Sequence, residues 1–275
     1  MNTSDNINSF SIRRSWASGR IYMPSIKRQL IIYGVTAICI YLINLLTIKY
    51  SFFLGIASFS LMSMASVCML YFSPVVFARR SDVAVETMLP ALPSEKVLFM
   101  IGHSLIAIPL VLYGIPALLN FIVSLISPDM ALNVKQSLNS FLGEIDSKAS
   151  LNPNADLIFG DNMLTKISNV LGCMVPISTC LFAVTAYRYN RTTMGIVWSV
   201  VSTIAQGLIG GLFGIYAAVK GFYDGLAENT QNGEEFLDAI LPQLHWFVIV
   251  SAIISLVYGL GMLYLTYRKV KNRQI

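Results

Sequence analysis

Charged residues are scarce in this chain. Only 12% of its 275 residues are Asp, Glu, Lys or Arg, and 55% are hydrophobic, whereas soluble domains carry about 25% charged residues. The apolar residues gather in six runs, near 30–48, 52–78, 97–126, 167–187, 195–219 and 244–267. At about 1.5 Å of rise per residue, each run is long enough to cross about 30 Å of hydrocarbon as a helix. The composition therefore excludes a soluble domain and predicts an all-α membrane protein with six transmembrane helices.

Ionisable residues are absent from the interior of these runs. No Asp, Glu, Lys or Arg lies deep in any of them, and the larger polar residues there are Asn44, His103, Asn120, Asn169 and Gln206. Carriers driven by a proton or ion gradient usually hold the coupling ion on ionisable groups at membrane depth. The chain also lacks any Gly-Lys pair, which excludes a P-loop. Uphill transport by this chain would therefore need a partner that hydrolyses ATP.

Catalytic and metal-binding motifs are missing as well. The sequence contains neither a G-x-S-x-G elbow nor an H-E-x-x-H pair, and His103 and its neighbour Ser104 would point about 100° apart on a helix. A lone histidine in a span is more often a packing residue, so an intramembrane enzyme would need a nucleophile from another span. Four cysteines lie inside apolar runs, which is typical of small hydrophobic residues: Cys39, Cys68, Cys173 and Cys180. No disulfide, metal or cofactor is expected in this chain.

The distribution of basic residues predicts the topology. Four segments, residues 1–29, 79–96, 188–194 and 268–275, hold 14 of the 19 basic residues, and the intervening loops hold ten of the 14 acidic ones. The positive-inside rule then places both termini in the cytoplasm. We expect a cytoplasmic or interfacial segment over 1–29, a transmembrane domain over 30–267 with an external loop at 127–166, and a cytoplasmic basic tail over 268–275.

Several polar segments show helical periodicity outside the apolar runs. Apolar residues recur at helical spacing in 131–147 and in 236–241, which predicts short amphipathic helices in the external loops. Near the amino terminus, Phe10, Trp16, Ile21 and Tyr22 lie among four arginines and a lysine. That composition favours a helix in the inner headgroup layer, with membrane lipid as its partner. For residues 1–9, a disordered basic tail is an equally good interpretation.

Glycine and proline mark particular spans. In the fifth run, two overlapping G-x-x-x-G pairs are formed by Gly207 with Gly211 and by Gly210 with Gly214. They predict close helix packing, within the chain or across a dimer, and the alternative is a helix that unwinds during transport. Prolines predict kinks in the second, third and fourth spans, at Pro74, Pro109, Pro116 and Pro176.

The segment between the second and third runs, residues 79–96, reads RRSDVAVETMLPALPSEK. Ser81 and Asp82 are suited to cap a short helix that ends at Pro90, and a rigid turn to Pro93 follows. Ser94 as N-cap and Glu95 as first-turn acid would then begin the third span. The simplest interpretation is a well-capped loop between two spans.

This segment also resembles part of a known family. Bacterial ABC-2-type transporter permeases carry an L-P-x-S-type turn followed by E-K between their second and third spans. The matching residues here are Leu89, Pro90, Ala91, Pro93, Ser94, Glu95 and Lys96. The order of features over nearly the whole chain agrees: a basic amphipathic amino terminus, six spans, both ends inside and a large external loop.

The resemblance implies a non-catalytic permease subunit in the bacterial inner membrane. A coupling helix near 80–92 would dock on a separate ATPase subunit, which binds the ATP, with a contact face formed by Arg79, Arg80, Glu86 and Leu89 and stiffened by Pro90 and Pro93. A second copy, or a related permease, would complete the exporter, and no nucleic-acid partner is expected. The alternatives are a non-transporting membrane sensor or assembly protein, and an intramembrane enzyme.

Overall fold

The computed structural model describes residues 10–50, 52–78, 91–126, 163–187, 189–227 and 233–273. The chain divides into two compact units. The first consists of Met1–Leu132, Pro176–Ser199 and Leu260–Ile275, and the second of Asn133–Val175 and Val200–Gly259. Each unit is described by itself below.

Six helices are long and apolar enough to cross a membrane, and the described residues form no strand. These segments are Ile12–Thr47, Leu61–Ala78, Pro93–Ile126, Ile167–Ala186, Arg191–Tyr216 and Trp246–Asn272. Each of the six apolar runs of the sequence falls on one of them, because a span must satisfy its backbone hydrogen bonds internally. The predicted all-α class and the number of spans are confirmed, and the chain is a multi-pass helical membrane protein by length and composition.

The first unit begins with a short helix, α1 (Ile12–Gly19), and a single 3₁₀ turn, η1 (Arg20–Tyr22), which leads into the long α2 (Met23–Tyr50). The helix α1 confirms that the basic amino-terminal stretch is helical. The next span, α3 (Phe52–Tyr71), packs on α2 and ends in the 3₁₀ turns of η2 (Ser73–Ala78). Pro74 lies in η2, where it cannot continue the α-helical ladder.

The third span is interrupted by two wide turns. It begins as α5 (Pro93–Gly102), passes through the π-helical turns η3 (His103–Ala107) and η4 (Leu110–Gly114), and ends as α6 (Ile115–Ile126). In η3, the Ile108 N–H donates to the His103 carbonyl. Both turns end two residues before a proline, Pro109 or Pro116, and proline removes one ladder hydrogen bond. The kinks predicted for this span therefore take the form of π-helical turns.

The remaining helices are long and continuous. They are α8 (Met163–Ala186), which contains Pro176, α9 (Arg191–Ala227) and α10 (Gly233–Arg273). Asn190, just before α9, has a φ of 51°, a left-handed conformation that Asn tolerates. In the second unit, Phe213 of α9 stacks on Phe247 of α10 with ring centroids 4.2 Å apart.

The structure corrects one prediction about α10. Residues 236–241 are not a separate short helix, because α10 begins at Gly233 and runs through them. The helix also includes Pro242, whose φ is compatible with a helix and which removes a single donor. At the other end, α10 reaches Arg273 and so includes part of the basic segment 268–275, whose cytoplasmic location stays a prediction. The predicted helix over 131–147 lies outside the described residues.

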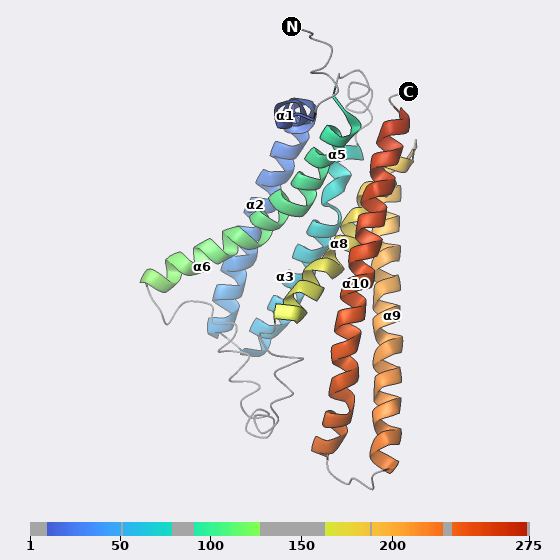
Figure 1. The fold of residues 1–275 in the computed structure, drawn as a ribbon. Helices are drawn as coiled ribbons and strands as arrows, with labels where there is room; N and C mark the ends of the chain where they lie inside the picture. Colours follow the sequence, from blue (N-terminus) through green and yellow to red (C-terminus); the bar gives the residue numbers. More distant parts are fainter. Residues whose placement is uncertain are drawn as a thin grey trace. The chain divides into compact units, whose positions relative to one another are not determined.

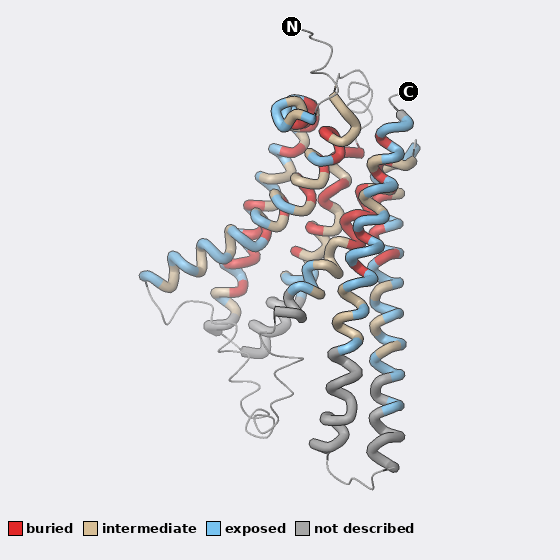
Figure 2. The backbone as a smooth tube through the Cα atoms, in the orientation of Figure 1, coloured by how far each residue is buried: buried red, intermediate tan, exposed pale blue. Residues whose placement is uncertain are grey.

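The core of the first unit lies where α2, η2, α5 and α8 meet. It contains Tyr22, Ile26, Phe77, Ala78, Met100, Cys180, Leu181 and Val184. Phe77 of η2 packs edge-on against Tyr22 with ring centroids 5.1 Å apart. Figure 2 shows the buried parts of this unit gathered toward one end of its helices, whereas α6 has no buried residue. Apolar surfaces of that kind are suited to face lipid.

Candidate functional site

The site begins at the first turn of α5, which is the last part of the segment 79–96 that carries the family resemblance. Leu92 has an extended backbone and is the N-cap residue, and Pro93 is the first helical residue. The Glu95 side chain reaches back and accepts a hydrogen bond from the Leu92 N–H at 3.0 Å, as the acid of a capping box does. Ser94 is therefore not the N-cap, contrary to the prediction, because Pro93 already occupies the first helical position. Glu95 is the first-turn acid, as predicted.

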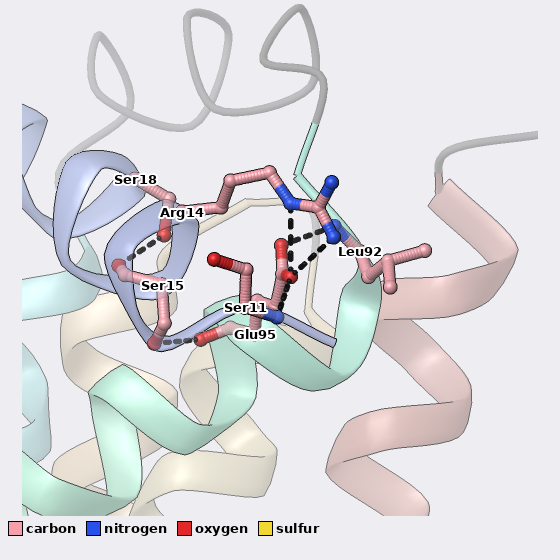
Figure 3. A network of polar contacts seen from close by, with 6 residues as sticks. All are labelled: Ser11, Arg14, Ser15, Ser18, Leu92 and Glu95. Carbon is pink, nitrogen blue, oxygen red and sulfur yellow. Dashed lines mark hydrogen bonds and ion pairs between the residues drawn. The ribbon is translucent and has the colours of Figure 1, made fainter. Parts of the chain in front are cut away.

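Glu95 is also the centre of a polar network with the amino-terminal helix (Figure 3). Its Oε1 accepts the Ser11 backbone N–H at 2.7 Å and the Arg14 Nε at 3.1 Å. The Arg14 Nη2 lies 3.0 Å from the same oxygen. Glu95 is fully buried, so its negative charge depends on these donors and on Leu92 instead of on water.

Backbone and ring contacts extend this junction along α1. The Ser15 hydroxyl donates to the Glu95 carbonyl at 2.6 Å, and the Ser18 hydroxyl donates to the Ser15 carbonyl at 2.7 Å. Trp16 meets Phe99 edge-on, with ring centroids 6.0 Å apart. A Cβ atom at Gly19 would overlap the Phe99 ring. The helix α1 thus packs on α5 at a distance that only glycine allows at this position. Figure 1 shows α1 next to the beginning of α5.

The predicted coupling residues divide into two groups. Most of them lie outside the described residues: Arg79, Arg80, Glu86, Leu89 and Pro90. Of the remainder, Pro93 and Ser94 are half-buried, whereas Glu95 and Lys96 are buried inside the chain. In this conformation, Glu95 and Lys96 therefore cannot contribute directly to a surface that a partner touches. Glu95 contacts the chain's own amino-terminal helix instead.

Sequence reasoning did not identify the residues that hold α1 on α5. It used the apolar residues of this stretch to predict a lipid-facing helix and assigned no role to Arg14 or to the small residues. Ser15, Ser18 and Gly19 occur at i, i+3 and i+4, the spacing of one helical face. A face of small residues permits close helix approach, and that signal was available in the sequence.

A second polar group connects α2, η2 and the third span. The Gln29 amide nitrogen donates to the Ser73 carbonyl at 3.0 Å, and its oxygen lies 2.9 Å from the His103 Nε2. Phe77 packs edge-on against the His103 ring at 5.5 Å. Within the described part of the chain, no Ser, Thr or Cys side chain is hydrogen-bonded to His103. Among the described residues, the His103 side chain therefore contacts Gln29 of α2 and Phe77 of η2.

The glycine pattern of α9 does not produce close contacts where the motif predicts them. No atom lies within 4 Å of a Cβ built at Gly207, Gly211 or Gly214, and at Gly210 the nearest is Phe247 at 3.9 Å. The close approach occurs at Gly195, where a Cβ would lie 2.8 Å from Val184 of α8. Packing of the G-x-x-x-G face within the described chain is therefore not observed. Packing across a dimer stays a prediction.

The described residues contain no group of three or more His, Cys, Asp or Glu side chains that is arranged to hold a metal ion. None of the four cysteines forms a disulfide. By length and composition, the six membrane-length helices make this chain a multi-pass helical membrane protein. Comparison with family models, with curated proteins and with solved structures found no match to this chain.

Proposed function

We propose that this chain is the membrane-spanning permease subunit of an ATP-driven ABC-2-type exporter in the bacterial inner membrane. The proposal rests on the resemblance of residues 79–96 to the loop of that family and on the six apolar spans that surround it. The observation that carries it furthest is the junction at Glu95. A loop that receives force from a partner needs a stiff connection to the next span, and the capped, buried first turn of α5 is such a connection.

The two ends of the segment suit a mechanical role. On one side it follows η2, whose Ser73 is joined to α2 and to His103 through Gln29. On the other side it enters α5 through Leu92 and Glu95. Movement of a docked ATPase would thus act on two spans at once. The π-helical turns η3 and η4 lie further along the third span, and wide turns of this kind are frequent at functional sites.

In this function the chain is mechanical and does not catalyse a reaction. The partner subunit binds and hydrolyses ATP, and its closure rocks the spans between inward-facing and outward-facing states. Two permease subunits, either two copies or a copy with a related chain, then enclose the substrate path. The apolar, uncharged interior of the spans is compatible with a lipid-like, drug-like or peptide substrate.

An affinity purification tests this proposal. The tagged chain is isolated in mild detergent, the bound proteins are identified, and ATP hydrolysis is measured on the eluate. We expect a P-loop ATPase that is lost when residues 80–92 are replaced by a Gly/Ser linker, and reduced by Arg80→Ala or Glu86→Ala. Lys271→Ala, which removes one exposed charge from the end of α10, is the matched control and should retain the ATPase.

Retention of the ATPase by the linker variant would contradict the location of the coupling site. Purification without any ATPase would contradict the transporter function and favour a membrane sensor or assembly protein. An unchanged elution profile in size-exclusion chromatography serves to show that the membrane domain of each variant has folded.

A further inference from the structure

The helix α1 has two distinct faces. Ser15, Ser18 and Gly19 are buried against α5. Ile12 and Trp16 border this buried face, with exposed fractions of 75% and 55%, and the Trp16 ring also meets Phe99 of α5. At about 100° per residue, Arg13 and Arg20 continue the exposed surface to the side opposite the buried residues. Among the described residues, α5 covers one side of α1, and the outward side is exposed.

The outward face has the composition of a headgroup-binding surface. Arg13 and Arg20 are exposed beside Ile12 and Trp16, and the stretch 10–28 contains five basic residues and no acidic one. Trp prefers the membrane interface, and arginines at the cytoplasmic surface attract anionic lipids at about 1 kcal/mol each. The helix is also joined through η1 directly to α2, the first apolar span. The occupant that fits this face is an anionic lipid surface.

Glu95 connects this lipid-facing helix to the end of the 79–92 segment. One carboxylate oxygen accepts the Ser11 N–H at the beginning of α1, and the other accepts the Leu92 N–H at the end of the segment. The same carboxylate binds Arg14. Because the carboxylate is buried, releasing any of these donors removes a partner that water does not replace. The positions of α1 and Leu92 are therefore linked through a single side chain.

We propose that the outward face of α1 binds anionic lipid headgroups and that Glu95 thereby clamps Leu92, the N-cap residue of α5, to the membrane surface. Glu95 is a positioning residue in this arrangement. The clamp involves only α1, Glu95 and Leu92, so it does not depend on the proposed transport function.

The lipid contact is tested with Trp16 as the only tryptophan, in a Trp198→Phe/Trp246→Phe background. The full chain is reconstituted in phosphatidylcholine vesicles with or without phosphatidylglycerol, and quenching by lipids brominated near the headgroup is compared with quenching by aqueous acrylamide. We expect brominated lipids to quench Trp16, and more strongly when phosphatidylglycerol is present. Arg13→Gln/Arg20→Gln should lose that increase, whereas Lys269→Gln/Lys271→Gln, with the same change in charge at the end of α10, should keep it. Quenching by acrylamide alone would overturn the lipid contact.

The clamp is tested by hydrogen exchange at the Leu92 and Ser11 amides in the same vesicles. Glu95→Gln should accelerate exchange at both amides by about tenfold or more, because hydrogen bonds to a charged acceptor are lost. Arg13→Gln/Arg20→Gln leaves Glu95 intact and should accelerate exchange at Leu92 in vesicles with phosphatidylglycerol, but not in phosphatidylcholine alone. Unchanged exchange at Leu92 in the arginine variant would overturn the clamp, even if Glu95→Gln proved to be misfolded.

Discussion

At the scale of single residues, the structure depends on a few positions where a side chain is either indispensable or not tolerated. Glu95 is indispensable, because an acceptor-only group without exposure to water must find all its donors within the protein. Gly19 and Gly195 are the opposite case, since their helices approach neighbouring side chains so closely that a methyl group does not fit. Alanine is a better helix former than glycine, so a loss of stability on Gly→Ala at these positions reports close packing and not helix propensity.

Gly19→Ala should release α1 from α5. The added Cβ would overlap the Phe99 ring, and overpacking of this kind costs about 1–3 kcal/mol. The variant should show a lower melting temperature in detergent and faster hydrogen exchange in α1. Phe99→Ala is costly by itself, but in the double variant the two effects should add to less than their sum. Gly102→Ala in α5 is the control, because no atom lies within 4 Å of a Cβ there; a loss of stability as large as that of Gly19→Ala would contradict the packing explanation.

Gly195→Ala should destabilise the contact between α8 and α9. Its Cβ would lie 2.8 Å from the Val184 Cγ2 and 3.3 Å from the Cys180 Sγ, and valine is stiff at χ1. We expect a loss of about 1–3 kcal/mol, seen as a lower thermal midpoint in detergent. Val184→Ala in the same chain should recover part of the loss. A midpoint equal to that of the unsubstituted chain would show that α9 moves aside at no cost.

At the scale of elements, the third span differs from a regular helix because of its prolines. Sequence reasoning predicted bends at Pro109 and Pro116, and the structure shows a π-helical turn before each of them. A wide turn keeps the backbone hydrogen-bonded inside the membrane, where an unsatisfied group is costly. In η3, for example, the His103 carbonyl accepts the Ile108 N–H.

Pro109→Ala should convert η3 into ordinary α-helix. Alanine restores the missing N–H and removes the ring, and proline is about 3 kcal/mol less favourable than alanine in a helix interior. We expect higher thermal stability and slower hydrogen exchange over 103–107. Faster exchange over 103–107 would show that the turn is not imposed by Pro109.

At the scale of the whole molecule, the number of spans and the charge of the loops together predict the orientation. With six spans, as found among the described residues, both termini are expected on the same side of the membrane. By the positive-inside rule, the basic residues predict that this side is the cytoplasm.

Reporter fusions check this topology. A reporter that is active only in the cytoplasm should be active when fused after residue 275, and one that is active only outside should be active when inserted within 127–166. The same pair of reporters, exchanged between the two positions, is the control and should be inactive. Activity of the external reporter at the carboxyl terminus would contradict the predicted orientation.

Pairing of two copies can be examined through the open glycine face of α9. Gly207 and Gly211 have space around them in the single chain, so Gly207→Ile/Gly211→Ile should leave the thermal stability of the monomer nearly unchanged. If this face packs across a dimer, the substitution should reduce chemical cross-linking between copies in vesicles, because bulky residues prevent close backbone approach. Leu208→Ile on the same helix is the control. Cross-linking that survives the double substitution would place the contact between copies elsewhere.

The sequence alone determined the features that depend on composition and local pattern. The all-α class and the six spans followed from apolar runs such as 195–219, since a membrane-spanning segment must be long, apolar and helical whatever surrounds it. The helical amino terminus and the first-turn role of Glu95 were predicted for the same local reasons. Predictions of where a helix begins were less accurate, since Leu92 and not Ser94 is the N-cap of α5, and α10 begins at Gly233 and already includes residues 236–241.

Only the tertiary structure decided which distant residues meet. Ser11 and Arg14 lie more than 80 positions from Glu95, and no periodicity connects them, because their contact depends on how α1 folds back onto α5. The glycines follow the same rule. A G-x-x-x-G pattern indicates a helix face that permits close approach, but it does not identify which helix packs on that face. The structure places the close contacts at Gly19 and Gly195, where the neighbouring helix supplies the ring or the methyl group that leaves room for no side chain.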